Sequence, residues 1–206
     1  MIKRLALAAL LGLTLSTPAL AQQMPSPEEI DKKVKETLDS LPKVEAKLEG
    51  VCTFVYPEVP SDPKEIAKRI GGSAGAPAGV DIDSLAKQYG PMVQKYLAKH
   101  LQRFGKLKVE TPFKVRSKTV PKGDHEFGFL IQGNTVKDQR IAAVIIYVEG
   151  EKKPIAIKMK AKKAPMQEKL EIELKKDKKK DDRFHIFTKF LQTIGRSGSA
   201  MKIEKS

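Results

Sequence analysis

Lysine is the residue type with the clearest chemical potential in this chain. The 206 residues contain 39 Lys and Arg against 25 Asp and Glu, a formal net charge of +14. The excess is concentrated between Gly150 and Lys180, where 12 Lys stand against four Glu and one Asp. Lysines gathered in this way attract polyanions through screened, non-specific electrostatics. The candidate polyanion-binding residues are Lys152, Lys153, Lys158, Lys160, Lys162 and Lys163.

The expected partners of these lysines are anionic lipid, lipopolysaccharide or acidic polysaccharide, the polyanions found outside the inner membrane of a bacterium. Nucleic acid is disfavoured, because the lysine positions lack the interleaved aromatic residues that stack bases and the arginines that read base edges. The sequence leaves one alternative open, in which the lysines only protect the edges of a sheet and keep the protein in solution.

One serine motif is the nearest approach to a catalytic signature. Gly71–Gly75 reads Gly-Gly-Ser-Ala-Gly and so matches the G-x-S-x-G of a nucleophile elbow. That elbow needs a strand before the serine, whereas a helical pattern precedes it here. We therefore predict no catalytic residue. The alternative is a hydrolase-type enzyme with a groove between a helical region and a β-region, in which Ser73, Asp81 or His100 would act and Gly71–Gly79 would form a lid.

The histidines and the single cysteine show no metal-ligand spacing. His100, His125 and His185 are far apart, and no close pair of His or Cys exists. The sequence therefore predicts neither a metal nor another cofactor. Cys52 cannot form an intrachain disulfide, and its apolar surroundings in Val51–Val55 favour a buried, inert thiol over a dimer bridge or a reactive site.

The first 21 residues predict an export signal. Lys3 and Arg4 precede an apolar run, Leu5–Leu15, and Ala19-Leu20-Ala21 forms a small-x-small cleavage site. The run is shorter than the roughly 20 residues that a membrane span needs. We expect residues 1–21 to be removed, no transmembrane segment in the mature chain, and a periplasmic or secreted protein.

Residues 22–105 are expected to be mainly helical, with one strand near 51–56. Ser26-Pro27-Glu28-Glu29 is a capping box, and the apolar spacing after it predicts a helix over 28–40. Further helices are predicted over Pro63–Ile70 and along an apolar face, Met92–Phe104, that ends at Gly105. This face favours core packing over an assembly contact, and Lys43–Gly50 is compatible with either a helical turn or a strand.

Residues 106–206 predict an antiparallel β-sandwich domain. Ile141–Val148 is continuously apolar, as in a strand covered on both faces. Gly195–Ser199 is expected to turn into a last strand around Met201. The fold class is therefore α+β, with N-terminal amphipathic helices packed on a C-terminal antiparallel β-sandwich of immunoglobulin or transthyretin-like type. Strands are also predicted in Lys106–Ser117, Asp124–Gln132, Lys153–Ala161, Lys169–Lys175 and Arg183–Leu191, in most of which apolar residues alternate with polar ones.

The segment Val120-Pro121-Lys122-Gly123-Asp124-His125-Glu126-Phe127 resembles a V-P-A-G-x-Y-x-(L/F) hairpin. That hairpin belongs to a family of exported bacterial β-sandwich domains of unknown function, and the resemblance spans roughly residues 110–204. The chain departs from the family pattern at Lys122 and His125, where Ala and Tyr are expected, and it contains no Trp. The resemblance implies a fold and transfers no site residue.

Together, these features predict an exported envelope protein that acts as a non-enzymatic binding or structural module. Its basic side would meet anionic surfaces.

Overall fold

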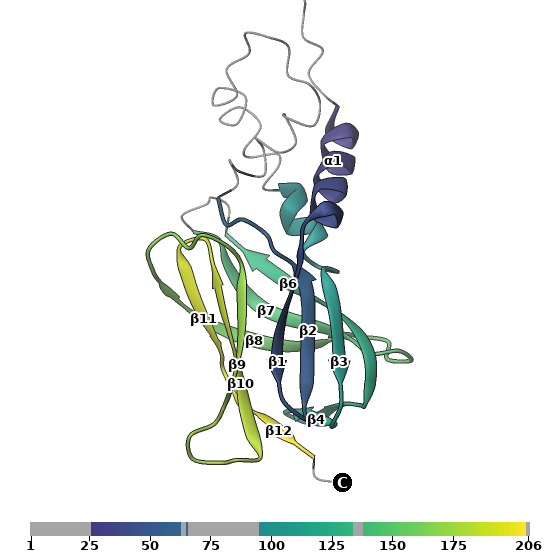
Figure 1. Ribbon diagram of the computed structural model, residues 1–206, viewed down its shortest axis with the longest axis vertical. Coiled ribbons are helices and arrows are strands. Elements are labelled where there is room, and N and C mark those ends of the chain that lie inside the picture. Colours follow the sequence, from purple (N-terminus) through teal and green to yellow (C-terminus); the bar gives the residue numbers. More distant parts are fainter. Residues whose placement is uncertain (1–25, 63–64, 66–94, 134–137, 205–206) are drawn as a thin grey trace, which may run out of the picture.

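A computed structural model describes residues 26–62, 65, 95–133 and 138–204. The predicted export signal and the Gly71–Gly79 loop lie outside these ranges, as does the helix predicted over Pro63–Ile70 apart from Glu65. Within them the chain is mostly antiparallel β-structure with a short helical region, which confirms the α+β class (Figure 1).

The described elements follow one another as helix α1 and strands β1 to β12. Residues 95–100 form a second helical segment between β2 and β3. The bounds are α1 (Pro27–Ser40), β1 (Lys43–Leu48), β2 (Cys52–Pro57), β3 (Gly105–Val109), β4 (Phe113–Val115), β5 (Lys118–Val120), β6 (Gly123–Gln132), β7 (Arg140–Tyr147), β8 (Ile155–Lys163), β9 (Glu171–Lys176), β10 (Arg183–Phe190), β11 (Thr193–Ser197) and β12 (Met201–Ile203).

Helix α1 begins at the predicted capping box. The Ser26 hydroxyl accepts from the backbone N–H of Glu29, and the Glu29 carboxylate accepts from the backbone N–H of Ser26. Asp31 in the next turn accepts hydrogen bonds from Lys99 at 2.6 Å and His100 at 2.7 Å. These bonds hold α1 beside helical residues 95–100, at the end of the strands (Figure 1).

Strand β8 connects two groups of strands. One group has the order β1-β2-β3-β6-β7-β8, and in the other β8 is followed by β11, β10 and β9. Residues 155–158 of β8 pair with β7, whereas residues 159–163 pair with β11. Strand β10 also pairs with β12, which leads to β4 and β5. Figure 1 shows β1–β3 and β9–β11 as separate groups, with β6–β8 behind them.

The strand pairing includes more of the N-terminal region than the sequence predicted. Lys43–Gly50, which was compatible with helix or strand, contributes β1, so this region holds two strands in place of one. Strand β2 pairs along its length with β3, with Cys52 opposite Val109. The pairing therefore crosses the boundary expected near residue 105. The second helix ends near His100, and the buried Leu97, Leu101 and Phe104 belong to the core.

Two predicted elements are different in the structure. Lys106–Ser117, predicted as one strand, is divided into β3 and β4, which pair in different groups. Pro112 lies at the break and has no backbone N–H for a continuous ladder. Gly195, expected in a turn, lies inside β11 opposite Thr188, and a Cβ atom there would come within 2.6 Å of the Thr188 hydroxyl.

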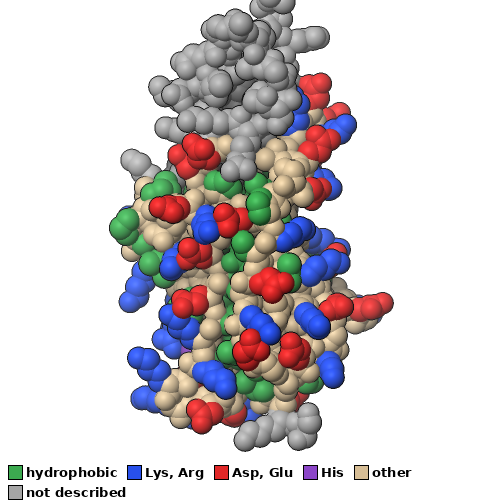
Figure 2. Space-filling model, viewed as in Figure 1, with side chains coloured by type: hydrophobic (Ala, Val, Ile, Leu, Met, Phe, Trp, Pro, Cys, Tyr) green, Lys and Arg blue, Asp and Glu red, His purple; other side chains and the backbone are tan. Residues whose placement is uncertain are grey.

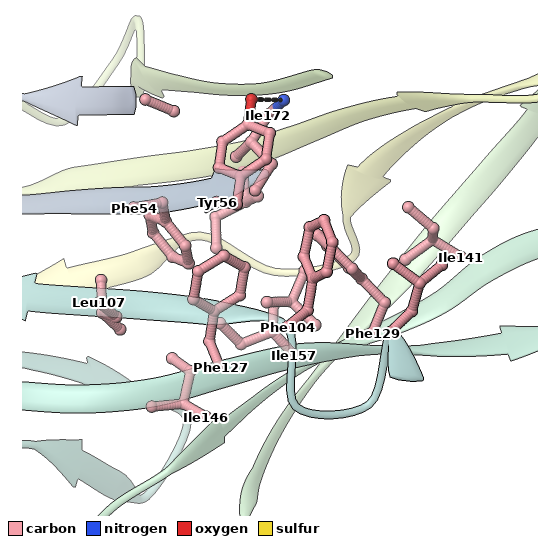
Figure 3. Close-up of a cluster of buried hydrophobic side chains, with 14 of the residues drawn as sticks. Phe54, Tyr56, Phe104, Leu107, Phe127, Phe129, Ile141, Ile146, Ile157 and Ile172 are labelled. Carbon is pink, nitrogen blue, oxygen red and sulfur yellow. Dashed lines mark hydrogen bonds between the residues drawn. The ribbon is translucent and has the colours of Figure 1, made fainter. Parts of the chain in front are cut away.

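The predicted alternation of apolar and polar residues is found in the strands that cover the core. The apolar residues at alternating positions of β3 and β4 are buried, as are Phe127 and Phe129 of β6, and five aromatic rings form a connected cluster between the strands (Figure 3). Edge-to-face contacts dominate in it, which aromatic pairs prefer. The cluster consists of Phe54, Tyr56, Phe104, Phe127 and Phe129.

A seam of long-range contacts joins the segment after β2 to the segment before β9. Leu170 donates its N–H to Val59 at 2.8 Å, and Ser61 donates to Glu168 at 2.9 Å. The buried Tyr56 hydroxyl then accepts the backbone N–H of Ile172 at 2.9 Å (Figure 3). The phenol thereby satisfies a donor that β9 would otherwise leave without a partner, since only β10 pairs with β9 in the described chain.

The variant Tyr56→Phe tests this seam. It should lower the free energy of unfolding by about 1–2 kcal/mol, because the N–H of Ile172 then stays buried without an acceptor. Urea unfolding followed by circular dichroism measures the change. Tyr147→Phe is the matched control, since the Tyr147 hydroxyl bonds to no described residue. Equal losses in both variants would contradict a specific role for the seam.

Candidate polyanion-binding face

Strand β8 places three of the predicted lysines on one face. Ile155 and Ile157 are buried, so the alternating Lys158, Lys160 and Lys162 point to the opposite, exposed side. The side chains of every second residue along a strand are spaced by roughly 7 Å. The side that the lysines face follows from the same alternation, because the buried isoleucines fix which side of β8 faces the core.

Strand β11 adds an arginine to these lysines. Arg196 lies directly opposite Lys160 in the β8–β11 register, and its side chain is exposed. Its guanidinium lies 5.7 Å from the centre of the Phe187 ring, on neighbouring β10, and stacks on it. We call the set Lys158, Lys160, Lys162 and Arg196 the β8–β11 basic face.

The lysines of the β8–β11 basic face have no carboxylate partner among the described residues. The cations of the neighbouring strands differ in this respect. Lys189 on β10 pairs with Glu171 at 2.8 Å, and Lys175 on β9 pairs with Glu173 at 2.8 Å. The charges of Lys189 and Lys175 are therefore neutralised, whereas those of the three β8 lysines are left available. Figure 2 shows Lys and Arg side chains gathered along the margin where Figure 1 places β11.

The other three predicted lysines lie apart from this face. Lys163 follows Lys162 at the end of β8, so alternation directs it to the other side, although it is exposed. Lys152 and Lys153 precede β8. Lys152 lines an open depression of about 450 Å³ in which four carboxylates stand against Lys152 and Arg103, namely those of Asp124, Glu126, Glu149 and Glu151.

Arg196 was missed because the sequence predicted a turn at Gly195–Ser199. Only the register of β11 against β8 brings Arg196 beside Lys160. The alternation of Ile194 and Arg196 with Gly195 and Ser197 was too short, and too rich in turn residues, to indicate a strand.

A buried histidine lies where β10 exchanges β11 for β12 as its partner. His185 contacts the Ser197 hydroxyl through Nδ1 at 3.0 Å and the Asp177 carboxylate through Nε2 at 3.1 Å. Arg196 also approaches Nε2, at 2.8 Å. A neutral imidazole with its proton on Nε2 donates to Asp177 and accepts from Ser197, whereas the other tautomer accepts from Arg196 and donates to Ser197.

Ser197, His185 and Asp177 are the residue types of a hydrolytic triad, but their positions do not suit that chemistry. Ser197 is only 2% exposed, so a substrate carbonyl has no path to its hydroxyl. The same hydroxyl also accepts the backbone N–H of Ile186 at 3.3 Å. The network therefore satisfies buried polar groups at the strand exchange.

The other candidate residues from the sequence either make structural contacts or lie outside the described residues. His100 is held by Asp31 in the contact between the helices, and His125 contacts the carbonyl of Pro121 at 2.8 Å. Ser73 and Asp81 of the hydrolase alternative lie outside the described residues. No group of three or more His, Cys, Asp or Glu side chains in the described ranges is arranged to hold a metal ion.

Cys52 is a free and fully buried thiol. Burial raises its pKa to about 12, with a smaller contribution from the charge of Glu110. The thiolate, which is the reactive form, is therefore scarce at neutral pH. This surrounding agrees with the inert thiol that the sequence favoured over a dimer bridge.

Membrane insertion through a helix finds no support in the described part of the chain. None of its helices combines the length and the apolar character that crossing a bilayer requires.

The variant Asp177→Asn should reduce the stability of the fold near neutral pH. The backbone N–H of Lys179 and the side chain of His185 lower the Asp177 pKa below its ordinary value of 3.8. A lowered folded-state pKa means that the ionised carboxylate stabilises the fold above pH 4 or so, and that this stabilisation is lost as the pH falls through the folded pKa.

The difference in melting temperature between the wild type and Asp177→Asn should therefore shrink as the pH falls below about 4 and through the lowered pKa of Asp177. Asp181→Asn is the control, because this carboxylate lies in the same turn and bonds to no described residue. A difference for Asp177→Asn that is independent of pH would contradict this assignment.

A second prediction concerns Cys52. The folded protein should show no labelling by an aromatic disulfide reagent at neutral pH, and urea should release one reactive thiol per chain, because unfolding removes the burial that raises its pKa. Absorbance of the released thiol measures both states. Rapid labelling of the folded protein, or a disulfide-linked dimer on a non-reducing gel, would contradict this.

Comparison of the chain with models of protein families, with curated proteins and with solved structures gave no match. The resemblance to the exported β-sandwich family therefore stays a prediction.

Proposed function

We propose that this protein is a non-enzymatic binding module of the bacterial cell envelope, periplasmic or secreted, which holds an anionic surface on its β8–β11 basic face. The observation that carries the proposal is the placement of Lys158, Lys160 and Lys162 on one exposed face, beside Arg196 and without carboxylate partners in the described chain.

The geometry of the face suits an extended anionic surface better than a single small anion. Its lysines lie in one row along β8, with roughly 7 Å between successive lysines, and Arg196 lies on the paired strand β11 about 4.8 Å away. Neither the depression at Lys152 nor the one lined by Asp182, Lys202, Ile203 and Glu204 includes a lysine of this face. Each lysine near an anionic membrane contributes about 1 kcal/mol of attraction, and the attraction is screened by salt.

We also infer that the two groups of strands form a sandwich of immunoglobulin or transthyretin-like type. The support comes from the seam at β9, where the Tyr56 hydroxyl of β2 accepts the N–H of Ile172 and so joins one group of strands to the other. The sandwich would present the outer side of β8 and β11 as a continuous surface, because the two strands pair directly over five residues.

The variant Lys158/Lys160/Lys162→Glu tests the proposed function. The wild type should bind phosphatidylglycerol vesicles and ignore phosphatidylcholine vesicles in a sedimentation assay, and added salt should weaken its binding. The variant should bind at least about 100-fold more weakly, since three contributions of about 1 kcal/mol are lost.

The matched control is Lys106/Lys108/Lys118→Glu. These lysines are exposed on β3 and β5, and their reversal changes the net charge by the same amount. The control should bind close to the wild-type level. An equal loss in both variants would show that net charge alone attracts the protein, and absence of wild-type binding at low salt would refute the proposal.

A further inference from the structure

Exposed apolar side chains border the β8–β11 basic face. Three large hydrophobic residues are markedly exposed in the described chain, namely Leu130 at 39%, Met166 at 44% and Ile194 at 40%. Exposed apolar residues are common on protein surfaces when they are scattered, and informative when they gather around one feature. The strand register places two of them, Leu130 and Ile194, in line with lysines of β8.

Ile194 belongs to the face directly, because it lies opposite Lys162 in the pairing of β11 with β8. Leu130 on β6 lies opposite Ala143 on β7, which in turn lies opposite Lys158. The two residues therefore lie in cross-strand rows that contain a lysine of the face, one row at each end of it.

Met166 is held near Ile194 by backbone hydrogen bonds. It lies in the connection between β8 and β9, in which Ala164 donates to the carbonyl of Gln192 at 2.9 Å and Gln167 donates to that of Leu191 at 2.7 Å. Both bonds end on the turn that leads into β11. Met166 and Ile194 are thus presented from one braced region, so little further ordering is needed for both to contact a partner.

The combination of lysines and exposed apolar side chains distinguishes between the anionic partners expected from the sequence. A soluble polysaccharide offers charge and hydroxyl groups but no apolar interior. A bilayer offers phosphate groups at its surface and acyl chains a few ångströms below, which matches lysines that border apolar side chains. Long lysine side chains can extend to phosphates while the apolar residues enter deeper.

We infer that the β8–β11 basic face docks on an anionic lipid bilayer, with Ile194 and Met166 entering the boundary between headgroups and acyl chains. The inference rests on the proposed function of the same face and names its partner. The lysines bind the phosphates and determine the preference for anionic lipid, and the apolar residues determine the preference for a bilayer over a soluble polyanion. Leu130 contacts the bilayer at the other end of the face.

The chain contains no Trp, so a single introduced Trp reports its own surroundings. In the variant Ile194→Trp, phosphatidylglycerol vesicles should shift the emission to shorter wavelength, and brominated acyl chains should quench it. Dextran sulfate, a soluble polyanion, should cause no such shift. Thr119→Trp, at an exposed position on β5, is the control and should respond to neither probe. Equal responses at both positions, or no quenching at Ile194→Trp on bound vesicles, would overturn the inference.

A second variant separates this inference from the proposed function. Met166→Ser combined with Ile194→Ser should bind phosphatidylglycerol vesicles about tenfold more weakly, because apolar burial is lost, and should bind dextran sulfate as the wild type does. Both residues are exposed, so its melting temperature should stay unchanged. Unchanged vesicle binding would overturn bilayer insertion and leave electrostatic binding intact. Failure of the wild type to bind either probe would refute the proposed function itself.

Discussion

The structure depends on one constraint at β8. The nine residues of this strand must form backbone pairing with two different neighbouring strands. Its first half pairs with β7 and its second half with β11. Backbone pairing on both sides fixes the orientation of the strand, and the buried Ile155 and Ile157 fix which side faces the core. The lysines at alternating positions must then lie outside, where they meet the residues of β11. The core and the basic face are therefore two results of the same alternation.

This dependence explains how much of the fold could be predicted from the sequence. Period-two alternation and the capping box at Ser26 are local signals, and both led to elements that the structure contains. The division of Lys106–Ser117 into β3 and β4 was not accessible in this way, because both halves keep the same alternation and differ only in their partners. Partner choice is a tertiary property that local pattern does not determine.

The candidate site shows the same limit. Lys158, Lys160 and Lys162 could be placed on one face from their spacing, whereas Lys152 could not be separated from them without the turn before β8. Lys152 instead lies among carboxylates of β6 and the β7–β8 connection. Residue type does not decide the role of Ser197 either. It has the partners of a catalytic serine, but its hydroxyl is buried and serves the packing of the strands. Exposure decides between reactive and structural roles, and it follows from the register.

The seam at Tyr56 also has a consequence for the order in which the chain folds. Its hydrogen bond joins residues 116 positions apart, whereas the hairpins β6–β7 and β10–β11 join neighbours in the chain. Closing so long a loop costs conformational entropy before any contact repays it. We therefore expect hairpins to form early and the seam to close late. Until then the outer edge of β9 has free backbone donors, so this edge is the part of the folding chain most exposed to pairing with another molecule.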